Sequence, residues 1–140
     1  MARNRNISSK GRQETGKFFN AHGAEDASPD TLPPIFCLQY LQPEYCLSKC
    51  EKEEKSAFAD RLYRLSQMTW TQIKCAHRHK LGFENIERTA IRAGIPKHIT
   101  PDVTLIAFRF YDKAPMVGYR NKRIFHIVWL DRTYSLYDHG

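Results

Sequence analysis

The feature that most constrains the fold of this chain is its C-terminal stretch, Val103–His139. Val, Ile, Phe, Tyr and Trp dominate three extended runs in it, Val103–Tyr111, Met116–Arg120 and Arg123–Leu130, and a shorter fourth run, Tyr134–Tyr137. These residues suit a pleated, half-buried surface. Because polar, turn-forming residues separate the runs, the stretch predicts consecutive strands of one sheet.

The chain is the size of one domain. Its 140 residues suffice for a hydrophobic core without disulfides or a structural metal. No apolar run approaches the roughly 18 residues that a membrane helix needs, and the N-terminus lacks the apolar core of a signal peptide. The sequence therefore favours a soluble protein of the cytoplasm and argues against membrane-spanning and secreted classes.

The chain is basic, with a formal net charge of +7. A basic domain fits an anionic partner, which is nucleic acid, an acidic protein or a membrane surface. The alternative is a solvated basic surface with no partner. Among these partners, we expect RNA or an acidic protein and no membrane.

The first 34 residues differ in composition from the rest. Residues 1–17 hold five cations and one anion, and the segment then turns acidic up to Pro34. Such a composition buries too little apolar surface to offset its ordering entropy. It predicts a flexible tail over residues 1–34 and a single domain over residues 35–140. The tail is either a basic arm that adds affinity for nucleic acid or an inert terminus.

The domain is predicted to begin with a strand, Ile35–Leu41, and to continue with helices. Ser48 and Glu51 have capping-box spacing and predict a helix over Glu51–Met68. Its apolar stripe consists of Phe58, Leu62 and Leu65.

A second capping box, Thr69 with Gln72, predicts a helix over Trp70–His77. A short third helix is expected over Ile86–Ile91, ended by Gly94. Helices followed by strands indicate an α+β fold, with two or three helices packed on one face of a mostly antiparallel sheet.

Soft metal ligands occur in two places. They are Cys46, Cys50, Cys75, His77 and His79. Zinc prefers two closely spaced ligand pairs, which these spacings do not provide, and two histidines at i and i+2 do not share a helical face. No cofactor is therefore predicted, and metal binding by these residues stays open. Cys50, near the start of a helix, is a weak candidate for a reactive thiol, since no second motif supplies a base.

Asn121 and Lys122 lie between two predicted strands and favour a two-residue hairpin turn. That register would place Arg120 opposite Arg123 and Val117 opposite His126. Two like charges directly opposite each other repel unless an anion lies between them. The pair therefore either binds phosphate or spreads into solvent.

Cleavage of RNA requires a base for the 2′-hydroxyl, cations for the charged phosphorane, and an acid for the leaving 5′-oxygen. Histidine titrates near neutrality and suits proton transfer, although His126, inside a strand, fits a structural role better. Arginine binds phosphate as a planar fork, and tyrosine stacks on bases. The candidate catalytic residues are His139, Tyr137 and Arg120, and the candidate nucleic-acid-binding residues are Arg109, Lys113, Lys122 and Arg123.

The plan of residues 35–140 resembles the RelE/ParE toxin superfamily, whose fold has a first strand, a helical hairpin and an antiparallel sheet. The positions that match by order are Arg109, Arg120, Lys122, Arg123, Tyr137 and His139. The resemblance implies an endoribonuclease toxin that cleaves RNA without metal and is covered by an acidic antitoxin. Some members act on proteins instead. The alternative is a non-catalytic module that binds nucleic acid or protein.

Overall fold

The computed structural model describes residues 28–77 and 81–139. Two α-helices and five strands make up the regular structure of this part of the chain. They are β2 (Ile35–Cys37), α2 (Lys52–Ser66), α3 (Trp70–Cys75), β3 (Phe83–Ile86), β4 (Leu105–Tyr111), β5 (Ala114–Asn121) and β6 (Ile124–Leu130). Short 3₁₀ turns occur at Pro29–Thr31, Pro43–Tyr45, Leu47–Lys49 and Arg88–Ala90.

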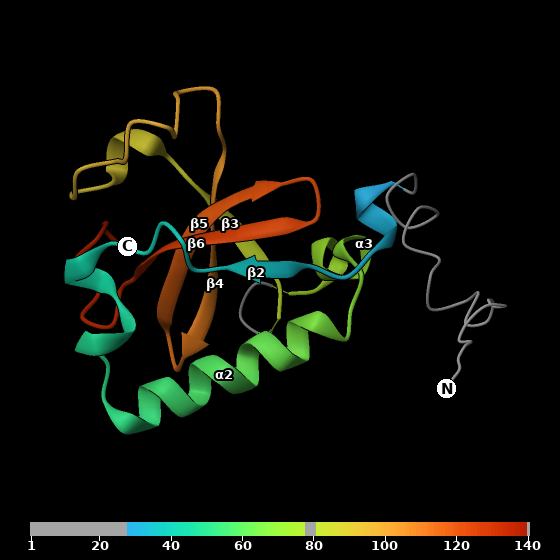
Figure 1. Cartoon of the computed structure of the whole chain (residues 1–140), viewed down its shortest axis with the longest axis horizontal. Helices are drawn as coiled ribbons and strands as arrows, with labels where there is room; N and C mark the ends of the chain where they lie inside the picture. Colours follow the sequence, from blue (N-terminus) through green and yellow to red (C-terminus); the bar gives the residue numbers. More distant parts are fainter. Residues whose placement is uncertain (1–27, 78–80, 140) are drawn as a thin grey trace, which may run out of the picture.

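The five strands form one sheet in the order β2-β6-β5-β4-β3. Strands β3 to β6 follow each other in an antiparallel meander, and β2 pairs parallel with β6 at the opposite edge from β3. The helices lie between β2 and β3 in the sequence and pack on one face of the sheet (Figure 1). The predicted α+β class is confirmed, and the sheet is mixed only through its short first strand.

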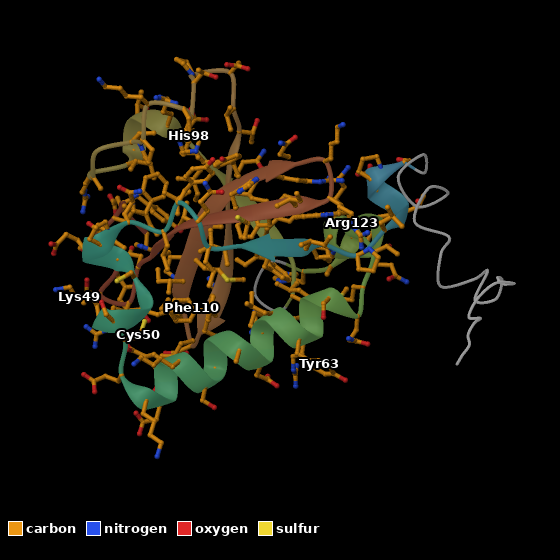
Figure 2. The ribbon with its side chains drawn as sticks, in the orientation of Figure 1. Lys49, Cys50, Tyr63, His98, Phe110 and Arg123 are labelled. Carbon is orange, nitrogen blue, oxygen red and sulfur yellow. The ribbon has the colours of Figure 1, made fainter. Side chains whose placement is uncertain are left out.

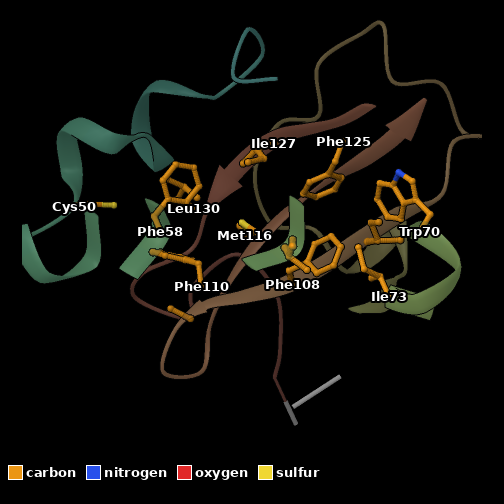
Figure 3. Packing of buried hydrophobic residues seen from close by; sticks show 13 residues of the cluster. Cys50, Phe58, Trp70, Ile73, Phe108, Phe110, Met116, Phe125, Ile127 and Leu130 are labelled. Carbon is orange, nitrogen blue, oxygen red and sulfur yellow. The ribbon is translucent and has the colours of Figure 1, made fainter. Parts of the chain in front are cut away.

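The helix-covered face holds the larger hydrophobic core. Aromatic rings from both layers meet there edge to face: Phe58 with Phe110 at 6.1 Å between centroids, and Phe108 with Phe125 at 5.1 Å. Trp70, the first residue of α3, is fully buried beside them (Figure 3). Edge-to-face contacts stabilise such packing beyond the apolar area that they bury.

The other face of the sheet is covered by irregular chain. Its buried cluster joins Val117 and Trp129 of the sheet to Ile99, Leu136 and Tyr137. Figure 1 shows the segment between β3 and β4 rising on the side of the sheet away from α2. The segment after β6 supplies the rest of the cover. Both faces are therefore buried, which explains why the strand runs are apolar rather than alternating.

Two helix predictions need correction. Helix α2 begins at Lys52, and its capping box joins Glu51 to Glu54, whose carboxylate accepts a 2.6 Å hydrogen bond from the Glu51 N–H. Ser48 lies in a preceding 3₁₀ turn. The predicted third helix is wrong, because the chain forms strand β3 there and then a single 3₁₀ turn. The second capping box, Thr69 with Gln72, is confirmed.

Two strand predictions are also wrong. The first strand ends at Cys37 rather than Leu41. The run Tyr134–Tyr137 forms a turn rather than a strand, because Ser135 and Leu136 donate their backbone N–H groups to the side chain of Asp131. Hydrogen-bond donors that a strand would offer to a neighbour are thus taken by one carboxylate.

The hairpin register also differs from the prediction by one residue. Asn121 pairs with Ile124, so the two-residue turn consists of Lys122 and Arg123, and Lys122 takes the positive φ of 58°. Arg120 therefore lies opposite Phe125, not opposite Arg123. The same register places Tyr119 opposite His126, and a bulge between Val117 and Gly118 then places Val117 opposite Trp129 instead of His126.

The described residues ahead of Ile35 also contact the domain. Asp30 forms ion pairs with Arg120 and Lys74, and the Leu32 carbonyl accepts a hydrogen bond from the Trp70 N–H. Residues 1–27 of the expected tail lie outside the described part. Within residues 28–77 and 81–139, the helices are too short or too polar to cross a membrane.

Candidate functional site

A surface groove of about 540 Å³ lies between β3, the β4–β5 hairpin and the C-terminal segment. It is lined by side chains of both charges and by aromatic rings, among them Glu84, Arg109, Lys113, Tyr134, Tyr137 and His139. Four of these, Arg109, Lys113, Tyr137 and His139, are among the seven predicted site residues.

The C-terminal side of the groove is built around Asp131, which is fully buried directly after β6. Its backbone N–H donates to the carbonyl of Pro115 at 2.9 Å and anchors it to the sheet. Its carboxylate accepts N–H groups of Ser135 and Leu136 at 2.9 and 3.0 Å, and His139 Nε2 lies 3.3 Å from Oδ2. One carboxylate thus closes the turn and holds the imidazole at the groove.

Tyr137 forms part of the floor of the groove. Its ring stacks on that of His139 with centroids 4.2 Å apart and an interplanar angle of 23°. Burial, followed by the negative charges of Glu84 and Asp131, raises the pKa of its hydroxyl well above the ordinary tyrosine range. The hydroxyl therefore stays protonated at physiological pH and can donate a hydrogen bond but cannot serve as a base.

The sheet supplies the opposite side of the groove. Glu84 of β3 pairs with Ala107 of β4, so Glu84 and Arg109, two residues further along β4, project from the same face. A bulge between Arg109 and Tyr111 turns the strand at this point, and Arg61 of α2 donates a 2.6 Å hydrogen bond to the Arg109 carbonyl. The backbone that carries Arg109 is thus fixed from the helix layer.

Lys113 completes the charged rim from the tip of the hairpin. The two residues between Tyr111 and Ala114 form the turn, and Asp112 takes the positive φ of 51°. The structure therefore gathers a carboxylate from β3, two cations from β4 and its hairpin, and a histidine from the C-terminal turn. This arrangement can place proton-transfer groups and cations around one phosphate.

The other predicted site residues lie at the far end of β5. Arg120 donates to the Asp30 carboxylate and lies over the Trp70 ring at 4.2 Å, a cation–π contact. Arg123 donates from Nε to the Pro33 carbonyl at 3.0 Å (Figure 2). The anion that offsets this charge is the chain's own Asp30, and Lys122 is exposed in the turn.

His126 belongs to a separate aromatic cluster. Its ring stacks on Tyr119 with centroids 4.8 Å apart, and Tyr119 lies 2.9 Å from His98 Nε2 through its hydroxyl. Burial, followed by the neighbouring His98, lowers the pKa of His126. The position agrees with the interpretation of His126 as a structural residue.

The cysteines do not converge on one place. Cys50 is buried in the core, and burial followed by Glu54 raises its pKa, which opposes thiolate formation. Cys46 makes a 2.8 Å contact with the Ser48 hydroxyl, and this hydrogen bond lowers the Cys46 pKa. Cys75 is exposed at the end of α3. In the described residues no group of three or more His, Cys, Asp or Glu side chains could hold a metal; His79 lies outside them.

Sequence reasoning missed Glu84, which lines the groove, and Asp131, which is buried behind it and holds the C-terminal turn. Glu84 lies just ahead of the helix predicted over Ile86–Ile91, in a segment for which no strand was predicted. Asp131 follows a long apolar run, and its position directly after the last strand was the available signal. The chain matches no protein-family model, and comparisons with curated proteins and with solved structures also gave no match.

Proposed function

We propose that this protein is a RelE-like endoribonuclease that cleaves RNA without a metal, at the groove between β3, the β4–β5 hairpin and the C-terminal turn. The observation that supports it is the convergence of Glu84, Arg109, Lys113 and His139 on that groove from four separate places in the sequence. A base, two cations and an acid are the groups that cleavage through the 2′-hydroxyl requires.

In the proposed reaction, Glu84 takes the proton of the 2′-hydroxyl, and the 2′-oxygen attacks the neighbouring phosphorus. The bond from phosphorus to the 5′-oxygen breaks, and His139 gives that oxygen its proton. The products are a 2′,3′-cyclic phosphate and a 5′-hydroxyl. The Asp131 carboxylate, 3.3 Å from Nε2 of His139, holds the imidazole at the groove for this role.

Arg109 and Lys113 supply the positive charge that the proposed reaction requires. The phosphorane carries more negative charge than the ground-state phosphate, so fixed cations beside it stabilise the transition state preferentially. Arg109 is half-buried, and its backbone carbonyl is held by Arg61, which fixes the point from which its side chain leaves the sheet. Lys113, exposed at the hairpin tip, contributes mainly to attraction of the substrate.

The proposed partner is an acidic antitoxin-like protein that covers the groove. The net charge of +7 favours such a partner, because complementary charge accelerates association and excludes other basic proteins. The alternative function is a non-catalytic module in which the same cations only hold phosphate.

The test is cleavage of a fluorescently labelled RNA in EDTA, with analysis of the product ends. We expect cyclic phosphate ends from the wild type, and rates lowered by about 100-fold to 10,000-fold in Glu84→Gln and His139→Ala. Arg109→Ala should also lower the rate. Arg64→Ala, on the exposed side of α2, is its matched control and should leave the rate unchanged. Expression of the wild type, but not of His139→Ala, should arrest growth.

Cleavage that persists in Arg109→Ala and His139→Ala would contradict the proposed site. RNA binding without cleavage, with an affinity that falls steeply as salt rises, would support the binding module instead.

A further inference from the structure

A second groove, of about 510 Å³, lies beside the first at the edge strand β3. Its lining includes Phe83, Asn85, Asp102, Thr104, Ile106 and Asn121. Asn85 lines both grooves, so the two meet at this residue. A polymer held in the first groove would therefore reach the second by passing the edge of β3.

The two grooves differ in chemistry. The first is lined by carboxylates, cations and a histidine. The second is lined by one carboxylate, Asp102, and one cation, Arg120, whose charge Asp30 offsets. The rest of its lining includes the neutral side chains of Asn85, Thr104 and Asn121 and the apolar side chains of Phe83 and Ile106. An apolar floor with a few convergent neutral donors and acceptors is typical of a site for a flat, uncharged ring with hydrogen-bonding edges.

The walls of the second groove are held in place before any ligand binds. The Phe83 ring packs against Trp70 and Phe108, with centroids 6.3 and 5.5 Å away. Tyr119, on the far wall, is fixed by its contact with His98. Side chains that are already ordered lose little entropy when they bind, which favours recognition.

Asp102 makes the groove suited to a ligand that donates hydrogen bonds. Its carboxylate accepts a hydrogen bond from the Thr100 hydroxyl, and this bond lowers the pKa of Asp102. An ionised carboxylate accepts hydrogen bonds and donates none. Among the donors of nucleobases, an exocyclic amino group suits it, as in the contact of Asp or Glu with the N4 amino group of cytosine.

We propose that the second groove binds one nucleobase that carries an exocyclic amino group, supplied by a nucleotide neighbouring the scissile phosphate. The inference rests on the proposed function for the nature of the polymer. It adds a selectivity that the catalytic groove lacks: cytosine over uracil at this position, read by Asp102 with help from Asn85 and Asn121.

The experiment measures binding without cleavage, by fluorescence anisotropy, with 2′-O-methyl hexacytidylate and hexauridylate as probes. These two probes differ only on the Watson–Crick edge of the base, where cytosine has an amino group and an N3 acceptor and uracil has a carbonyl and an N3–H donor. We expect the wild type to bind the cytidine probe about tenfold more tightly. Asp102→Asn should abolish that preference, because an amide can also donate to the uracil carbonyl, and Asp60→Asn on α2 is the charge-matched control.

Equal affinity of the wild type for both probes would overturn the inference, and so would a preference that survives in Asp102→Asn. Asn85→Ala is the second variant, and it should weaken binding of both probes. Failure of the proposed function would give a different result: the wild type would leave unmodified RNA intact, while its base preference would still depend on Asp102. Conversely, cleavage that requires His139 with no base preference would remove only the second site.

Discussion

His139 Nε2 lies 3.3 Å from Oδ2 of Asp131, a fully buried carboxylate that also accepts the backbone N–H groups of Ser135 and Leu136. The candidate acid and the turn that delivers it thus depend on the same two oxygen atoms. A change at Asp131 should therefore affect both folding and the proposed catalysis, whereas a change at His139 should affect mainly the proposed catalysis.

Asp131→Asn should destabilise the protein by about 1–3 kcal/mol, because the new amide nitrogen faces a backbone N–H and leaves a buried donor without an acceptor. Urea denaturation measures this loss. Asp112→Asn is the matched control: Asp112 is exposed and has a φ of 51°, which asparagine tolerates. Equal stability of Asp131→Asn and wild type would contradict the role given to this carboxylate.

Tyr137→Phe should change how stability depends on alkaline pH. The pKa of Tyr137 is raised in the folded protein, so above about pH 10 the unfolded chain loses a proton that the folded chain keeps. Wild-type stability is therefore complete below that pH and falls as the pH rises further. Tyr137→Phe should show a shallower fall in denaturation experiments. A fall of the same slope in both proteins would mean that this hydroxyl ionises freely in the folded state.

The strands of the C-terminal half could be predicted because their residues are β-branched or aromatic over long runs. Strand β3 could not, since Phe83–Ile86 contains Glu84 and Asn85, which are uncommon in strands. Its place in the sheet is set by pairing with Leu105–Phe108, a contact between distant segments. The misassigned segment carries Glu84, so the candidate base was missed together with the strand.

Arg109, Lys113, Tyr137 and His139 could be proposed for the site from residue type and position in the chain. Their convergence could not, because it depends on the turn around Asp131. The predicted hairpin register was wrong for a local reason: Asn121 is a favourable turn residue, but Lys122 takes the positive φ instead. A shift of one residue was enough to remove the predicted anion site between two arginines.

Asp30→Asn should change the acid side of the stability profile. The hydrogen bond from Arg120, followed by that from Lys74, lowers the pKa of Asp30 in the folded protein. Its contribution is therefore present at neutral pH and is lost as the pH falls below about 4, through the folded pKa. Since Asp30 is 39% exposed, the contribution should stay within about 1 kcal/mol.

The measurement is thermal or urea unfolding at a series of pH values. Wild type and Asp30→Asn should differ at pH 7 and converge in acid. Asp60→Asn, in a more exposed ion pair with Arg64, is the control and should differ less from wild type at every pH. A difference that stays constant down to the lowest pH would show that Asp30 acts through something other than its charge.

Gly118→Ala tests the close approach of β5 and β6 at Gly118, beside the bulge between Val117 and Gly118. A Cβ atom at Gly118 would lie 1.8 Å from the carbonyl oxygen of His126, so the two strands must separate to admit it. Forced overpacking of this kind costs about 1–3 kcal/mol or more. Gly94 offers a matched control, since a Cβ atom there meets nothing within 4 Å. Gly94→Ala should change stability by less than about 0.5 kcal/mol. Equal urea midpoints for the two variants would mean that the close approach at Gly118 is absent in solution.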